Sequence, residues 1–146
     1  MSRRERVHGW QARLVLRLPH RYRQVVWNYV MPAVDALCEV DRKVVAEIRG
    51  VGSADLYSRL VELFKTGSSE ALAQLRAALA TSAFHPARAV CHRLKSSAAN
   101  VGALAFSRQV GLLEQLCVAG DLDRARALLE GLQAAHSGLI TQLGRS

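Results

Sequence analysis

The chain has 146 residues and a net charge of +8, from 20 Lys and Arg against 12 Asp and Glu, and half of its residues are apolar. This length predicts a single domain, and the apolar content is sufficient for a core. Aromatic residues make up only 5%, which disfavours a sheet that stacks single-stranded RNA bases. Alternating runs of Val, Ile and Thr are also missing, which disfavours an all-β fold.

The apolar residues do not form long runs. No stretch reaches the roughly 18 residues that a membrane span needs, and no segment of signal-peptide type follows the charged N-terminus. We therefore expect a cytoplasmic protein without a membrane span. Cys38, Cys91 and Cys117 are an odd number of cysteines without C-x-x-C spacing. They are interpreted as small buried residues in a reducing compartment, not as disulfide partners or zinc ligands.

Positive charge is concentrated at the N-terminus. Residues 1–30 contain seven arginines and one acid, Glu5, and so carry +6 of the net charge. We interpret residues 1–32 as a basic arm or linker and residues 33–146 as the folded body. A basic arm can contact nucleic acid or acidic lipid, although a charge run of this kind is more often a solvated leader.

From about residue 33 onward, apolar residues recur every three or four positions, which predicts helices. A short helix is expected to begin after Asp41, as its N-cap, and to end near Arg49. A second is expected over 54–80, with a break near 66–69 left open by Gly67. Its predicted apolar stripe consists of Leu56, Leu60, Leu63, Phe64, Gly67, Ala71, Leu75, Ala78 and Leu79.

Three further helices are predicted in the second half. Pro86 is favoured at a first helical position and begins a helix that runs to about Asn100. The next covers 103–118 and ends before Gly120, and its core candidates are Phe106, Val110, Leu113 and Cys117. Asp121 caps the last helix, with the apolar seam Leu122, Ala125, Leu129, Leu132, His136, Leu139 and Leu143.

Amphipathic helices joined by short turns predict an all-α fold. We expect an up-down antiparallel four-helix bundle, preceded by a short extra N-terminal helix and the basic arm. His136 lies on the apolar seam of the last helix and is interpreted as a structural, hydrogen-bonded histidine.

One histidine is predicted to face solvent in the middle of the third predicted helix, which begins at Pro86. On a helical wheel, Val90, Leu94, Ser97, Ala98 and Val101 share one face. His92 lies on the opposite face, together with Arg88, Lys95, Ser96 and Ala99. The two cations would compensate an anion such as a phosphoryl group on the imidazole, and the small side chains leave room for another protein. The pattern predicts a functional surface histidine.

The run from His92 to Ala103, HRLKSSAANVGA, resembles the histidine-containing phosphotransfer (HPt) family, whose pattern is His-x-Leu-Lys-Gly-Ser-(Ser/Ala)-x-x-x-Gly-Ala. The His, Leu, Lys, Ser, Gly and Ala of that pattern are all in register. A looser resemblance extends over about residues 38–143. One position departs from the pattern, since Ser96 stands where the family usually has glycine.

The resemblance implies an up-down four-helix bundle without an ATP site or kinase activity of its own. Such a domain accepts a phosphoryl group on its histidine from the aspartate of one receiver domain and passes it to another receiver. By position, His92 would be phosphorylated, Lys95 would neutralise phosphate oxygens, and Glu114 would hydrogen bond to the imidazole. Gly102 would permit the sharp turn between helices. We expect Arg88, Ser96, Ala99 and Gly102 to belong to the partner-binding surface.

The implied partners are receiver domains of response regulators or hybrid sensor kinases. Mg²⁺ would be bound by the receiver's carboxylates, and we expect no cofactor or metal in this chain. Consistent with this, the sequence contains no acidic cluster with Mg²⁺ spacing, no Gly-rich phosphate loop and no HxxxH or HExxH pair.

Two alternatives remain open on the sequence. One is a helical nucleic-acid-binding protein that uses the arginine-rich arm. The other is an HPt-like adaptor that docks a receiver or kinase without being phosphorylated.

Overall fold

A computed structural model describes residues 19, 21, 34–52 and 55–146 of the chain. Its regular elements within these residues are all helices: α3 (Val34–Leu37), α4 (Arg42–Val51), α5 (Asp55–Ala80), α6 (Phe84–Asn100), α7 (Leu104–Ala119) and α8 (Leu122–Gly144). The all-α prediction is therefore confirmed for the described part. The predicted basic arm, residues 1–32, lies outside it apart from two positions.

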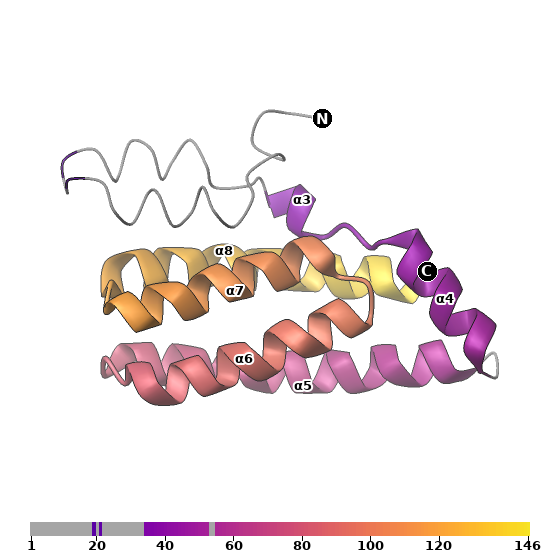
Figure 1. The fold of residues 1–146 in the computed structure, drawn as a ribbon, viewed down its shortest axis with the longest axis horizontal. Helices are drawn as coiled ribbons and strands as arrows, with labels where there is room; N and C mark the ends of the chain where they lie inside the picture. The colour runs from indigo at the N-terminus through magenta and orange to yellow at the C-terminus, as the bar shows by residue number, and fades with distance from the viewer. Residues whose placement is uncertain (1–18, 20, 22–33, 53–54) are drawn as a thin grey trace.

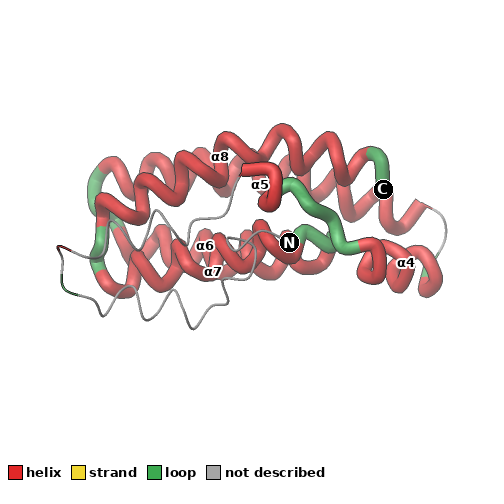
Figure 2. The backbone as a smooth tube through the Cα atoms, turned by 90° about the horizontal axis from the view of Figure 1, so that it is seen from above, coloured by secondary structure: helices red, strands yellow, loops and turns green. Residues whose placement is uncertain are grey.

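The four long helices lie side by side and form the body of the molecule (Figures 1 and 2). α5 packs against α6 and α8, and α7 packs against the same two helices. The short α3 packs on α8 and α7, while α4 contacts α5 near one end of the body. Among the described helices, none combines the length and apolar character that a membrane crossing requires.

Leucines from all four long helices fill the space between them. Phe64 of α5 and Phe106 of α7 meet edge to face, with ring centroids 6.4 Å apart. Each fully buried leucine contributes about 1.5–3 kcal/mol to folding, so this core supplies most of the driving force. The largest fully buried side chains are Tyr57, Phe106, Leu37, Leu75, Leu79, Leu113, Leu116, Leu128, Leu132, Leu139 and Leu143.

The predicted stripe of α5 is wrong at several positions. Leu63 is 71% exposed and Gly67 is exposed as well, whereas Tyr57 and Ser68 are buried. The hydroxyl of Tyr57 donates to the Val101 carbonyl at 3.1 Å. Polar groups with such partners can be buried, which hydropathy spacing does not reveal. The buried residues of α5 are Tyr57, Val61, Phe64, Ser68, Leu72, Leu75 and Leu79.

Gly67 does not interrupt α5, which runs without a break from Asp55 to Ala80. The start of α6 also differs from the prediction, because the helix begins at Phe84 and Pro86 is its third residue. The first four N–H groups of a helix have no partner within it, so a proline is tolerated there as well as at the first position. His85 therefore belongs to the first turn of α6 and does not cap it.

The caps predicted for α4 and α8 are confirmed. The Asp41 carboxylate accepts hydrogen bonds from the backbone N–H groups of Lys43 and Val44, at 2.9 and 3.1 Å. The Asp121 carboxylate accepts one from the N–H of Arg124 at 3.4 Å. The core candidates of α7 are buried as predicted, and those of α8 are buried apart from Leu122 and His136, which are partly exposed.

The turn between α6 and α7 depends on Gly102, whose φ of +89° is in the left-handed region. Its carbonyl accepts a hydrogen bond from the Asp41 N–H at 2.8 Å. A Cβ at this position would lie 3.2 Å from the Asp41 carbonyl oxygen. The turn is thus tied to the beginning of α4 and has no space for a side chain.

We predict that Gly102→Ala destabilises the fold more than Gly120→Ala. Both glycines have positive φ, which costs alanine about 1–2 kcal/mol. A Cβ at Gly120 meets nothing within 4 Å, so only Gly102→Ala adds a steric clash. Urea unfolding of the two variants measures the difference. Equal losses of unfolding free energy would show that the contact with Asp41 has no effect.

We also predict a pH dependence of stability from His136. Its Nε2 lies 2.7 Å from the hydroxyl of the buried Ser68, and desolvation by burial lowers the pKa of His136 below its ordinary value of 6.5. Below about pH 6.5 the unfolded chain therefore binds a proton that the folded chain resists. Stability is full above that pH and decreases as the pH falls toward the lower folded pKa.

Urea unfolding at about pH 7.5 and about pH 5.5 measures this effect. The decrease should be smaller in His136→Gln than in the unchanged protein, whereas His85→Gln, at an exposed histidine, should retain it. A decrease of the same size in His136→Gln would mean that other groups cause it.

Candidate functional site

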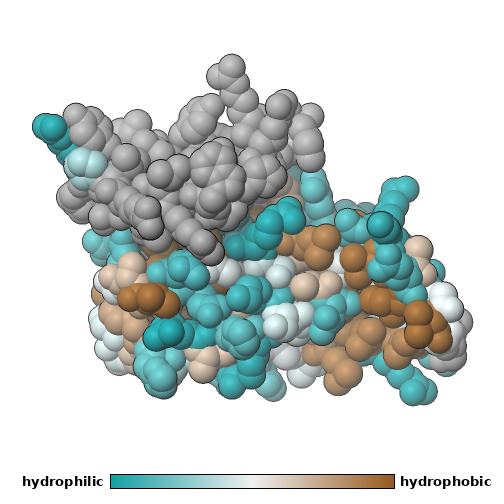
Figure 3. Space-filling model, in the orientation of Figure 1, coloured by the Kyte–Doolittle hydropathy of each residue, from teal (hydrophilic) through white to brown (hydrophobic). Residues whose placement is uncertain are grey.

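α6 buries one face and presents His92 on the other. Val90, Leu94 and Ala98 are buried in the core, while the His92 side chain is 70% exposed. This is the arrangement that the wheel predicts, and it follows from the spacing of the apolar residues. Figure 3 shows mostly hydrophilic side chains over the middle of α6 and α7, while apolar side chains gather toward the end where α4 lies.

Glu114 of α7 lies between His92 and Lys95 of α6. Its Oε2 accepts a hydrogen bond from the Lys95 ammonium at 3.2 Å. Its Oε1 lies 3.8 Å from Nδ1 of His92, which is within ion-pair range but longer than a hydrogen bond. The Glu114 side chain is only 19% exposed, so it is mostly covered where it meets the two α6 residues. The structure therefore brings together the three residues to which the sequence assigned the chemistry.

The contact with Glu114 distinguishes the two ring nitrogens of His92. Nδ1 is the atom near the carboxylate, and a proton on Nδ1 is favoured by that negative charge. With the proton on Nδ1, Nε2 carries the free lone pair of a side chain that is 70% exposed. A histidine held in this way can act as a nucleophile toward a group that arrives from solvent.

Lys95 is less exposed than the sequence suggested. Its side chain is 39% exposed, because the stem lies across α7 before the ammonium reaches Glu114. Two α7 residues that sequence reasoning missed contribute to this position. The Ser107 hydroxyl donates to the Lys95 carbonyl at 2.7 Å, and Gly111 lies next to the Lys95 stem. Their spacing of four and seven residues from Ser107 to Gly111 and Glu114 is the signal that could have identified them.

The core directly behind His92 contains two thiols. Cys91 and Cys117 are buried. The hydrogen bond between them is the larger cause, and desolvation by burial the second, that raises the pKa of Cys91 above its ordinary value. A protonated, buried thiol is neither a nucleophile nor a base, so Cys91 does not assist His92. Cys91 and Cys117 are thus buried as the sequence predicted, whereas Cys38 is only partly buried, and its thiol donates to the Ala135 carbonyl at 3.3 Å.

The four residues predicted to bind a partner differ in how exposed they are. Arg88 and Ser96 are exposed and Ala99 is half-buried on α6. The Ser96 hydroxyl donates to the His92 carbonyl at 3.3 Å, so it is bound to the helix backbone. Gly102 is buried under the start of α4, which makes it part of the turn and not of an exposed docking surface.

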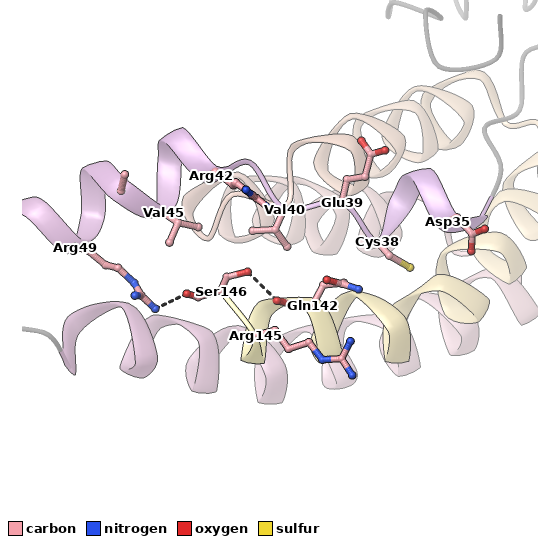
Figure 4. Close-up of a pocket in the computed structure, with 11 residues that line it drawn as sticks. Asp35, Cys38, Glu39, Val40, Arg42, Val45, Arg49, Gln142, Arg145 and Ser146 are labelled. Atoms are coloured by element: carbon pink, nitrogen blue, oxygen red, sulfur yellow. Dashed lines mark hydrogen bonds between the residues drawn. The ribbon is translucent and has the colours of Figure 1, made fainter. Parts of the chain in front are cut away.

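A groove of about 960 Å³ lies away from this site, between α3, α4 and the end of α8 (Figure 4). Arg49 donates to the Ser146 carbonyl there and also lies over the Tyr57 ring, 5.4 Å from its centroid. The groove contains both arginines and acids, so its charge does not favour a ligand of one sign. Its lining residues include Asp35, Glu39, Arg42, Arg49, Arg145 and Ser146.

Two further expectations concern metal ions and nucleic acid. Within residues 34–52 and 55–146, no group of three or more His, Cys, Asp or Glu residues could hold a metal ion. The proposed contact with nucleic acid depends on the arginine-rich arm, which lies outside the described residues except for Arg21, and it stays a hypothesis.

The family comparison agrees with the geometry of this site. The model of the Hpt domain matches residues 59–142, which include His92, Lys95 and Glu114 and extend from α5 into α8. No curated protein and no solved structure shows significant similarity to the chain. The match covers more than half of the sequence, and on this basis the chain belongs to the Hpt domain family.

Proposed function

We propose that this protein accepts a phosphoryl group on His92 from the aspartyl phosphate of one receiver domain and transfers it to the aspartate of another. Hpt domains are phosphotransfer modules of two-component phosphorelays, and they are not kinases or ATP-binding enzymes. The observation that supports the assignment to His92 is its contact with Glu114, which also holds Lys95.

The proposed transfer is a displacement at phosphorus. The Nε2 lone pair of neutral His92 attacks the phosphorus atom, and an N–P bond forms as the P–O bond to the aspartate breaks. The electron pair of that bond leaves with the carboxylate, and the ring keeps its Nδ1 proton and becomes an N-phosphoimidazolium. The Glu114 carboxylate, 3.8 Å from Nδ1, stabilises the positive charge that develops on the ring. Transfer to the second receiver is the reverse displacement.

Lys95 is proposed to stabilise the negative charge of the phosphoryl oxygens. Its ammonium is one helical turn from His92 and has three donors, of which Glu114 engages one. α6 also carries Arg88 and Arg93 and no acidic residue, so its exposed face is cationic. Such a face complements the acidic pocket of a receiver, where we expect the partner's carboxylates to bind Mg²⁺.

The proposal also assigns the helices. α5 to α8 would be the four helices of an up-down antiparallel bundle, with α4 as the short extra helix that precedes it. The short turns between α5, α6, α7 and α8 support this topology, because they favour antiparallel neighbours. Receiver domains of response regulators or hybrid kinases are the partners that this role requires.

We predict that His92→Gln abolishes phosphoryl transfer and retains the fold. Purified protein is incubated with radiolabelled phosphorylated receiver domains and Mg²⁺, and the label on this chain is followed. The unchanged protein should acquire an acid-labile, alkali-stable label, as a phosphohistidine does, and His92→Gln should acquire none. Circular dichroism checks that the variant is folded.

Two outcomes would contradict this proposal. A label of equal intensity on His92→Gln would place the phosphoryl group on another residue. No label on either protein, with receiver binding retained by both in a pull-down with a panel of receivers, would indicate the non-phosphorylated adaptor.

We predict that Lys95→Ala slows the transfer about tenfold, because a charge that stabilises the transition state is lost from a partly exposed position. The helix content should not change, since alanine is a good helix former. Lys65→Ala is the matched control, because it removes the same charge from an exposed position on α5. Single-turnover transfer from a phosphorylated receiver measures both variants. If Lys95→Ala and Lys65→Ala transferred the phosphoryl group at equal rates, Lys95 would have no role in the transfer.

A further inference from the structure

We propose that Gly111 of α7 is a positioning residue for phosphotransfer, because the absence of a side chain at this position creates the space in which the Lys95 stem lies. The inference rests on the proposed function, in which the Lys95 ammonium acts on the phosphoryl group. It assigns a role in that reaction to a residue that does not touch the reacting atoms.

The space at Gly111 fits the stem closely. A Cβ built at this position would lie 3.2 Å from Cδ of Lys95, which is shorter than the 3.5–4.0 Å at which carbon atoms attract each other best. No other atom outside the helix is near that Cβ position. An alanine at 111 would therefore contact Lys95 before anything else, and the lysine stem would have to move a few tenths of an ångström away from α7.

Three residues of α7 engage three parts of Lys95. Ser107 binds its backbone carbonyl at 2.7 Å, Gly111 accommodates its stem, and Glu114 accepts a hydrogen bond from its ammonium at 3.2 Å. These residues follow one another at spacings of four and three, so they form one stripe on the side of α7 that faces α6. The stripe fixes the path of a side chain that otherwise has four rotatable bonds.

The path of the stem determines where the ammonium ends. On its present path, the ammonium meets Oε2 of Glu114, and Oε1 of the same carboxylate faces His92. A stem displaced by this amount would lengthen the 3.2 Å hydrogen bond from the ammonium to Glu114 and shift the ammonium relative to the imidazole. Small displacements slow a reaction that depends on positioning.

A second glycine provides the matched control. Gly67 lies in the middle of α5, and a Cβ there would meet nothing within 4 Å. Gly67→Ala and Gly111→Ala are the same chemical change in the interior of a helix. Alanine favours the helix over glycine, so Gly67→Ala should raise the thermal midpoint by a few degrees.

The experiment measures single-turnover transfer to His92 at saturating phosphorylated receiver. We expect Gly111→Ala to reduce this rate about three- to fivefold, a smaller loss than in Lys95→Ala, with receiver affinity changed less than about twofold and with no decrease in thermal midpoint. Gly67→Ala should transfer at the unchanged rate. A slower reaction in a protein that is no less stable is a result that a purely structural role would not give.

A double-mutant cycle with Lys95→Ala tests whether Gly111 acts through the lysine. If it does, Gly111→Ala has no further effect on transfer once the Lys95 side chain is absent. Unchanged transfer in Gly111→Ala, or the same rate loss with and without Lys95, would overturn the inference. These outcomes differ from failure of the proposed function, in which the unchanged protein itself acquires no label on His92.

Discussion

The contact of the Glu114 carboxylate with both Lys95 and His92 is the interaction on which the site depends. One oxygen binds the Lys95 ammonium at 3.2 Å and the other lies 3.8 Å from the imidazole, so a single side chain of α7 contacts two residues of α6. The contact requires α6 and α7 to keep their relative position. That position is maintained by their buried faces, by the hydrogen bond from Ser107 to Lys95 and by the tight turn at Gly102. The packed helices therefore form a rigid support for the proposed chemistry on their surface.

The sequence predicted the helices well where burial follows apolar spacing. In α6 the buried residues are apolar or small, and the exposed position of His92 follows directly from them. In α5 the same reasoning failed at Tyr57 and Ser68, because their polar atoms have partners in the turn after α6 and on α8. Those partners, Val101 and His136, are far away along the chain. A spacing rule within one helix cannot identify them.

The same limit applies to the candidate site: residues of one helix could be predicted together, but contacts between helices could not. His92 and Lys95 belong to one helix, so their common face could be predicted from their separation in the sequence alone. Glu114 comes from the next helix, and only the resemblance to HPt domains pointed to it. Ser107 and Gly111 escaped prediction because their importance depends on how α7 packs against α6. A glycine within a helix has no side chain from which a function could be predicted. The role proposed for Gly111 depends on Lys95 of the neighbouring helix.

The His92 side chain is 70% exposed, and this has a consequence for the order of events in the proposed relay. Any donor and any acceptor must reach the same ring nitrogen from the same side. Two proteins cannot occupy that place at once, so the first has to dissociate before the second can bind. Between the two encounters a phosphorylated ring would be exposed to water. Its lifetime would then depend on its own hydrolysis and on the supply of acceptors, because the described residues leave most of the His92 side chain uncovered.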